Sequence, residues 1–147
     1  MVNHIIRVWL PAIGLLVLAA CSGTVSTRDD STHGGTEVYP LTQEDAVLVM
    51  RSAMDKEFES DKISAVLSPH RGFQGKIRLL SDIDTITVYA VPARGRGPDG
   101  QQVDGFAFEV KHSGTYPLGG IPKAKAVLAD VVAGADRLVK SLPAVEQ

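Results

Sequence analysis

The chain of 147 residues is poor in cysteine, in aromatic side chains and in net charge, and each shortage excludes something. Its single cysteine cannot form an intramolecular disulfide, which leaves intermolecular pairing, a free thiol or a modification. Aromatic residues make up 5% of the sequence and the one Trp, Trp9, lies close to the N-terminus, so a stacking platform for bases or sugars is not expected. A net charge of −2 with both signs interspersed lacks the basic excess of a nucleic-acid-binding surface.

The N-terminus has the layout of a secretory signal peptide. Arg7 gives a basic start, residues 8–18 are apolar throughout, and small residues follow as far as Gly23. The apolar run is shorter than the roughly 20 residues of a membrane-spanning helix, and Pro11 and Gly14 disfavour a helix there. The pattern therefore predicts export.

The end of this segment, Leu18-Ala19-Ala20-Cys21, resembles the lipobox of bacterial lipoproteins: a Leu, two small residues and a Cys that closes the apolar run. The resemblance implies a diacylglycerol on the Cys21 thiol, cleavage between Ala20 and Cys21, and, as is usual in Gram-negative bacteria, acylation of the new amino terminus. Two or three acyl chains give the durable anchoring that one chain does not. Two alternatives stay open: a soluble secreted protein that carries a free Cys, and an uncleaved amphiphilic N-terminus.

Ser22 follows the lipobox Cys. In Gram-negative lipoproteins an Asp at this position tends to retain the protein at the inner membrane, and Ser resembles the default that is passed to the outer membrane. The resemblance therefore implies a lipid-anchored protein at the outer membrane, facing the periplasm. The membrane is the first expected partner, and an envelope protein or a cell-wall component is the second.

Three regions are expected along the chain. Residues 1–20 form the lipoprotein signal peptide, residues 21–38 a lipidated flexible linker, and residues 39–147 one small domain. The linker is rich in Ser, Thr, Gly and Asp, and such a segment buries too little apolar surface to offset the entropy of ordering. As a coil it would span roughly 20–25 Å. His33 lies within it and is expected to be solvated.

Two amphipathic helices are predicted on either side of a strand-rich middle. The first runs from Gln43 to about Glu59 behind Thr42, which fits an N-cap, and the second begins at Pro122, since Pro suits a first helical turn. Apolar residues recur at spacings of three and four in both. The stripe of the first helix is Val47, Met50, Met54 and Phe58, and that of the second is Leu128, Val131, Val132, Ala135, Leu138, Val139 and Leu142.

Between the helices, alternating hydrophobicity predicts strands at 63–67, 73–80, 84–92 and 103–112, of which the first is weak. The last two are expected to pair as an antiparallel hairpin across a loop at 93–102. The expected fold class is α+β: a two-layer sandwich with a roughly three-stranded antiparallel sheet and an N-terminal and a C-terminal helix packed on one face. The opposite face is expected to be wet or to bind a partner; it carries Thr87, Tyr89, Glu109 and Lys111.

The residues that support catalysis or metal binding are few. The sequence has no Gly-x-Ser-x-Gly motif, and a Ser-His site would have to combine His70 or His112 with Ser68 or Ser113. We interpret both histidines as partly solvated residues of a turn and a strand end. Asp82 and Asp84 lack the remaining spacing of a calcium loop and are interpreted as residues that cap a turn. No catalytic residue, metal site or cofactor is therefore predicted.

One loop carries a candidate for binding an anion. The stretch GRGPDG has glycines, but it lacks the Gly-Lys-Ser/Thr ending of a phosphate-binding loop and the helix that follows one. Arg94 and Arg96 are expected at the tip of this loop, where they are free to contact an anionic group such as a lipid head group, a glycan or an acidic partner. A mobile, solvated hairpin loop is the alternative interpretation.

Three functions remain in competition. The first is a membrane-anchored envelope lipoprotein that acts as a non-enzymatic binding or structural module. The second is a periplasmic domain that binds a lipid or a small ligand in a cavity behind Phe106 and Phe108. The third is a periplasmic hydrolase, which requires a pocket that brings His70 or His112 within hydrogen-bonding distance of a Ser or a carboxylate.

Overall fold

The computed structural model describes residues 23–26, 37–79, 82–114 and 117–142. The fold is α+β, with two α-helices and an open five-stranded antiparallel sheet in the order β1-β5-β4-β3-β2. The elements in chain order are β1 (Gly23–Ser26), α1 (Gln43–Glu57), the 3-10 helix η2 (Ser60–Lys62), β2 (Ile63–Val66), β3 (Gly72–Leu79), β4 (Asp82–Arg96), β5 (Gln102–Ser113) and α2 (Pro117–Ser141).

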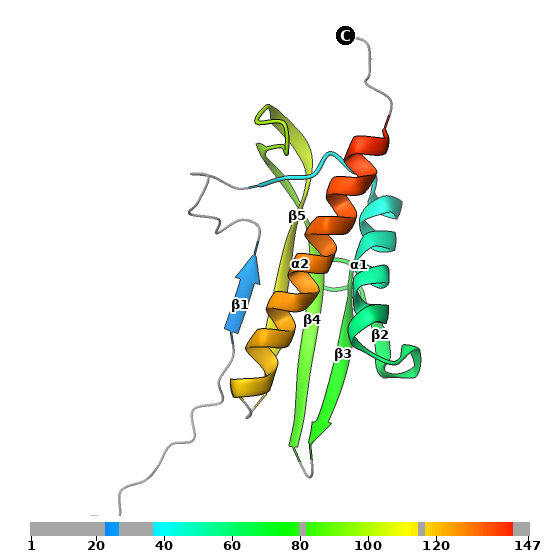
Figure 1. Cartoon of the computed structure of the whole chain (residues 1–147), viewed down its shortest axis with the longest axis vertical. Helices are drawn as coiled ribbons and strands as arrows, with labels where there is room; N and C mark the ends of the chain where they lie inside the picture. Colours follow the sequence, from blue (N-terminus) through cyan, green and yellow to red (C-terminus); the bar gives the residue numbers. More distant parts are fainter. Residues whose placement is uncertain (1–22, 27–36, 80–81, 115–116, 143–147) are drawn as a thin grey trace, which may run out of the picture.

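Both helices lie in front of the sheet, side by side and running in opposite directions (Figure 1). α1 contacts β3 and β4, and α2 contacts β1, β4 and β5. The core fills the space between the two layers, where Met50 and Met54 of α1, Val127 and Val131 of α2 and Phe108 of β5 are fully enclosed. The other face of the sheet is left open by both helices (Figure 1).

The two predicted helices are present. Thr42 caps α1, since its hydroxyl accepts a hydrogen bond of 3.1 Å from the Asp45 backbone N–H. α1 ends where Phe58 adopts an extended backbone, close to the expected boundary at Glu59. α2 begins at Pro117, ahead of the expected Pro122, which lies inside the helix. Gly134 of α2 faces α1: a Cβ there would stand 3.1 Å from Val49 Cγ1, so the missing side chain lets the helices approach closely.

The expectation of roughly three strands is wrong, because the sheet has five. β2 is the weakly patterned strand and forms one edge. β1 forms the other edge and lies within the stretch expected to be linker; Val25 stands opposite Val110 of β5 and packs against the core. Four residues with one apolar side chain carry little pattern of their own, so the pairing with β5 supplies most of the order. The rest of the expected linker up to residue 36 lies outside the described residues, as do the signal peptide and Cys21.

The predicted hairpin of β4 and β5 is confirmed, but the loop between its strands is shorter than expected. β4 continues to Arg96 and β5 starts at Gln102, so the turn comprises only residues 97–101. Gly97 N–H donates to the Gln101 carbonyl at 2.8 Å, and Gly100 adopts φ +82°, a conformation that favours glycine. Among the described residues, neither helix combines the length and the apolar character that crossing a membrane requires.

Candidate functional site

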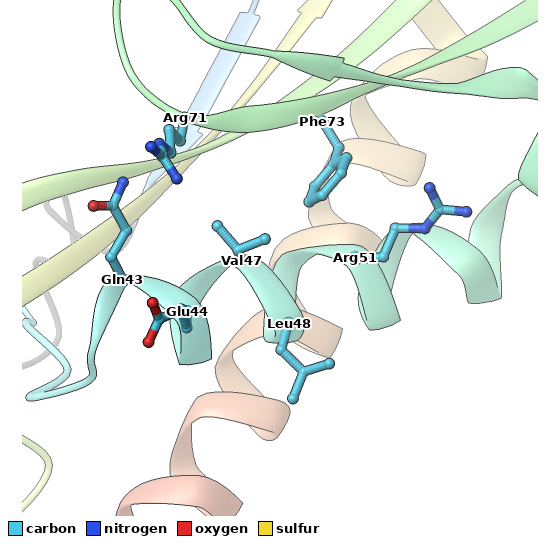
Figure 2. Close-up of a pocket in the computed structure, with 7 residues that line it drawn as sticks. All are labelled: Gln43, Glu44, Val47, Leu48, Arg51, Arg71 and Phe73. Atoms are coloured by element: carbon cyan, nitrogen blue, oxygen red, sulfur yellow. The ribbon is translucent and has the colours of Figure 1, made fainter.

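A groove of about 520 Å³ opens between the N-terminal half of α1 and the start of β3 (Figure 2). The gap is filled further along, where the Phe58 ring occupies the space over Gly75; a Cβ at Gly75 would lie 2.7 Å from that ring. The groove is lined by Gln43, Glu44, Val47, Leu48, Arg51, Arg71 and Phe73. A side chain of a bound molecule could therefore enter between helix and sheet without displacing the core.

Apolar groups dominate the centre of this groove. Val47 and Phe73 point toward each other from α1 and β3, while Leu48 points away from the sheet (Figure 2). Leu48 is 60% exposed and extends the apolar surface of the groove outward along α1. The three side chains offer a partner apolar contact area that water covers at present.

Two arginines stand at the borders of the groove. Arg51 lies over the Phe73 ring, with Cζ 5.8 Å from the ring centroid. The Arg71 guanidinium is exposed, and no described residue forms a hydrogen bond or an ion pair with it. The lining also contains one acid, Glu44, and Arg51 forms an ion pair with Asp55, so Arg71 is the cation of the lining without a paired carboxylate among the described residues.

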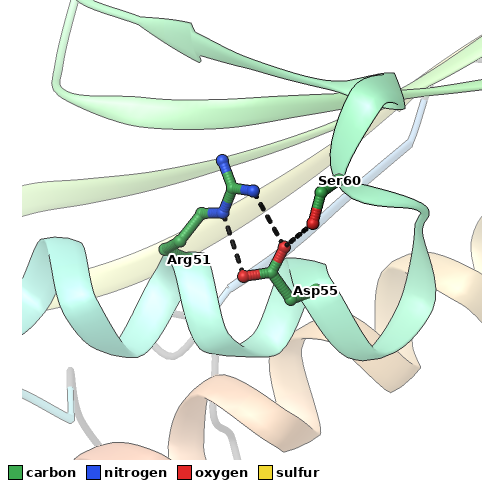
Figure 3. A network of polar contacts seen from close by, with 3 residues as sticks. All are labelled: Arg51, Asp55 and Ser60. Carbon is green, nitrogen blue, oxygen red and sulfur yellow. Dashed lines mark hydrogen bonds and ion pairs between the residues drawn. The ribbon is translucent and has the colours of Figure 1, made fainter.

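Arg51 is held in place by its own helix. Its Nε and Nη2 donate to the two carboxylate oxygens of Asp55 at 3.0 and 2.9 Å, and Ser60 Oγ donates to the same carboxylate at 3.1 Å (Figure 3). The hydrogen bond from Arg51 lowers the pKa of Asp55, and the hydrogen bond to Asp55 raises the pKa of Arg51. The pair is therefore fully charged at neutral pH, which fixes a cation beside the apolar centre of the groove.

A second polar pair lies in the core, where sequence reasoning did not place it. His112 is 1% exposed and Asp84 5%, and the His112 Nε2 lies 3.1 Å from Asp84 Oδ2. The other ring nitrogen, Nδ1, is buried without a hydrogen bond to any described residue. The expectations of a partly solvated His112 and of a turn-capping Asp84 are therefore wrong. Strand alternation would have revealed both, because they share faces with Ile86 and Val110.

The serines named as candidates do not join this pair. Ser113 follows His112 in β5, so their side chains leave opposite faces of the sheet. Ser68 and His70 lie in the connection between β2 and β3. The Asp84–His112 contact supplies the carboxylate neighbour expected of a hydrolase, but both side chains are buried, with 6% and 0% of their surface exposed.

The arginines considered for anion contact lie at the end of β4, in strand geometry. Arg94 Nε is 3.4 Å from Asp104 Oδ1 across the hairpin, and both side chains are more than two-thirds exposed. The Arg96 backbone carbonyl accepts a hydrogen bond from Val38 N–H at 2.9 Å. Within the part of the chain that the structure describes, no three His, Cys, Asp or Glu side chains gather closely enough to hold a metal ion.

The comparisons with known proteins found no relative of this chain. No family model, no curated protein and no solved structure matches the chain. The lipidation residue Cys21 and the cleavage residue Ala20 lie outside the described residues, so the resemblance to lipoproteins continues to rest on the sequence motif alone.

Proposed function

We propose that the protein is a lipid-anchored binding module of a bacterial envelope, held at the outer membrane by acyl chains on Cys21 and facing the periplasm. The observation that carries the anchor is the Leu18-Ala19-Ala20-Cys21 motif at the end of an apolar run. The observation that supports binding, rather than catalysis, is the open groove between α1 and β3, in contrast to the enclosed Asp84–His112 pair.

The groove chemistry favours a segment of another envelope protein with an apolar side chain next to a carboxylate. The apolar side chain would cover Val47, Leu48 and Phe73, and its burial would supply most of the binding free energy. The carboxylate would pair with Arg71, whose planar guanidinium suits two parallel hydrogen bonds. Arg51 is already paired with Asp55 and would contribute its planar group stacked over the Phe73 ring.

The anchor is tested by the substitution Cys21→Ser. Without the thiol no thioether to diacylglycerol forms, so the signal peptide is expected to stay attached and the protein to lack acyl chains. Intact-mass analysis of the membrane fraction measures both. A Cys21→Ser protein of the same mature length as the unsubstituted one would contradict the anchor.

The groove is tested by placing a photo-crosslinking amino acid at Leu48 and, as a control, at Leu67. Both side chains are exposed, at 60% and 77%, but only Leu48 borders the groove. We expect irradiation of intact cells to give one defined crosslinked product from position 48 and at most one-tenth of it from position 67. Equal yields from the two positions, or no product from position 48, would argue against the groove as the binding site.

A further inference from the structure

We propose that one end of the domain, the end where β1 begins, lies directly on the bilayer and contacts anionic lipid head groups with the open face of the sheet. This inference rests on the proposed lipid anchor and names the surface that the anchor brings to the membrane. The cationic side chains of that surface are Lys76, Arg78 and Lys111, with Ile83 beside Arg78.

The anchor is close to the sheet. Ser22 alone separates Cys21 from Gly23, so the Cα atoms of Cys21 and Gly23 are at most about 7 Å apart. Gly23 pairs with His112 at the C-terminal end of β5, and Thr24 pairs with Lys111. An acylated Cys21 would therefore hold this end of the sheet at the lipid surface, and the flexible spacer of 20–25 Å expected from the sequence would not separate the two.

The strand register brings cations together at the same end. On the open face, Arg78 stands beside Ile83, Lys76 is in line with Thr85 and Ser113, and Lys111 is in line with Thr24, Thr87 and Gln74. These three rows contain three cations and no acidic residue. Among the paired strand residues of this face, the next acid is Glu109, one row further and opposite Tyr89. A cationic patch of this kind is attracted to phosphatidylglycerol and other anionic lipids.

An apolar contact accompanies the charges. Ile83 is 50% exposed next to Arg78, and Ile121 of α2, 36% exposed, lies near β1, with its Cδ1 3.6 Å from the position of a Cβ on Gly23. In Figure 1 the start of β1, the start of α2 and the β3–β4 hairpin all lie toward the lower end of the molecule. The β4–β5 turn and the end of α2 lie at the upper end. Contact with lipid at the lower end would leave the α1–β3 groove free for a protein partner.

The test uses fluorescence quenching by brominated lipids, because cleavage before Cys21 removes Trp9, the only Trp of the chain. The full-length gene is expressed with Ile83→Trp or, as a control, with Leu142→Trp. The mature lipidated protein is then reconstituted into vesicles of brominated phosphatidylcholine that contain about 30 mol% phosphatidylglycerol. The phosphatidylglycerol gives the vesicles a negative surface potential. Leu142 is 47% exposed at the far end of α2. We expect at least threefold stronger quenching of the Trp at position 83.

The expected contact is electrostatic, so the quenching at position 83 should fall to the level of the control in phosphatidylcholine alone or when Lys76, Arg78 and Lys111 are all replaced by Glu. Equal quenching of the two positions in the phosphatidylglycerol vesicles would overturn the inference.

If Ile83→Trp does not fold, amide hydrogen exchange of the unsubstituted protein replaces the quenching experiment. Residues 76–85 should exchange at least threefold more slowly on phosphatidylglycerol vesicles than on phosphatidylcholine vesicles. Residues 97–101 should exchange at the same rate on both. Equal exchange of residues 76–85 on the two vesicles would likewise overturn the inference.

Failure of the anchor is recognised separately in the same samples. Intact mass and vesicle flotation report whether Cys21 carries acyl chains. A floating, acylated protein with equal quenching at both positions overturns only the lipid-facing surface. A bare thiol on Cys21 overturns the proposed anchor and this inference with it.

Discussion

Two carboxylates of this protein hydrogen-bond a nitrogen-bearing side chain at nearly the same distance, in opposite surroundings. Asp84 binds His112 at 3.1 Å with side-chain exposures of 6% and 0%, and Asp55 binds Arg51 at 2.9 Å with exposures of 40% and 36%. The buried pair spans two strands, whereas the exposed pair spans one helical turn. The comparison separates a contact that the fold depends on from a contact that a ligand can reach.

Burial is what makes the difference. Water competes for the exposed pair and replaces its hydrogen bonds when they break, so such a pair contributes little to stability. A buried polar group that loses its partner has no water to replace it and bears the full cost of desolvation. We therefore expect the Asp84–His112 pair to matter for folding and the Arg51–Asp55 pair to matter for the charge of the groove.

The largest effect is expected from His112→Ala. The substitution removes the imidazole that the Asp84 carboxylate binds and leaves a cavity at a buried position, so the free energy of unfolding should fall by about 3 kcal/mol. Urea denaturation of the purified protein, followed by circular dichroism, measures the change. The matched control is His70→Ala in the connection between β2 and β3, for which we expect a change within about 0.5 kcal/mol.

Equal losses of stability in the two histidine variants would contradict the contrast between buried and exposed pairs. Burial of His112 would then add nothing to the free energy of unfolding. A loss for His112→Ala with no loss for Asp84→Asn would sharpen it. Asn keeps the shape and the acceptor oxygen of Asp84 but removes its charge. That result would show that the hydrogen bond, and not the carboxylate charge, is what the core requires.

The parts of the fold that could be predicted from the sequence are the segments with a hydrophobic periodicity of their own. The periodicity of three and four residues located α1 and α2, and the alternation of Val88 and Val110 with polar neighbours located the β4–β5 hairpin. The early start of α2 at Pro117 was missed, since the five residues before Pro122 are a Pro, a Leu, two glycines and an Ile, which carry no helical pattern.

The features that were missed depend on residues far apart in the chain. β1 has one apolar side chain, Val25, and is ordered by its pairing with β5, more than eighty residues away. The α1–β3 groove exists because α1 packs against β3 at Phe58 and Gly75 and leaves a gap near Val47, which no local pattern encodes. His112 and Asp84 are the exceptions, because alternation along β5 from Val110 and along β4 from Ile86 would have placed them in the core.

The smallest effect on stability is expected from Asp55→Asn, which removes the carboxylate that holds Arg51. Because Arg51 lowers the folded-state pKa of Asp55, this pair stabilises the protein above the ordinary pKa of an aspartate, about 3.9, and the contribution is lost as the pH falls through the lowered folded pKa. The urea midpoint of Asp55→Asn should therefore lie slightly below that of the unsubstituted protein at about pH 7, and the difference should shrink as the pH falls through the lowered folded pKa of Asp55. The yield of crosslinked product from position 48 should change by a larger factor than the urea midpoint, because the released Arg51 no longer stays over the Phe73 ring. A midpoint difference that persists in acid, or a stability loss as large as that of His112→Ala, would show that exposure is not what separates the two pairs.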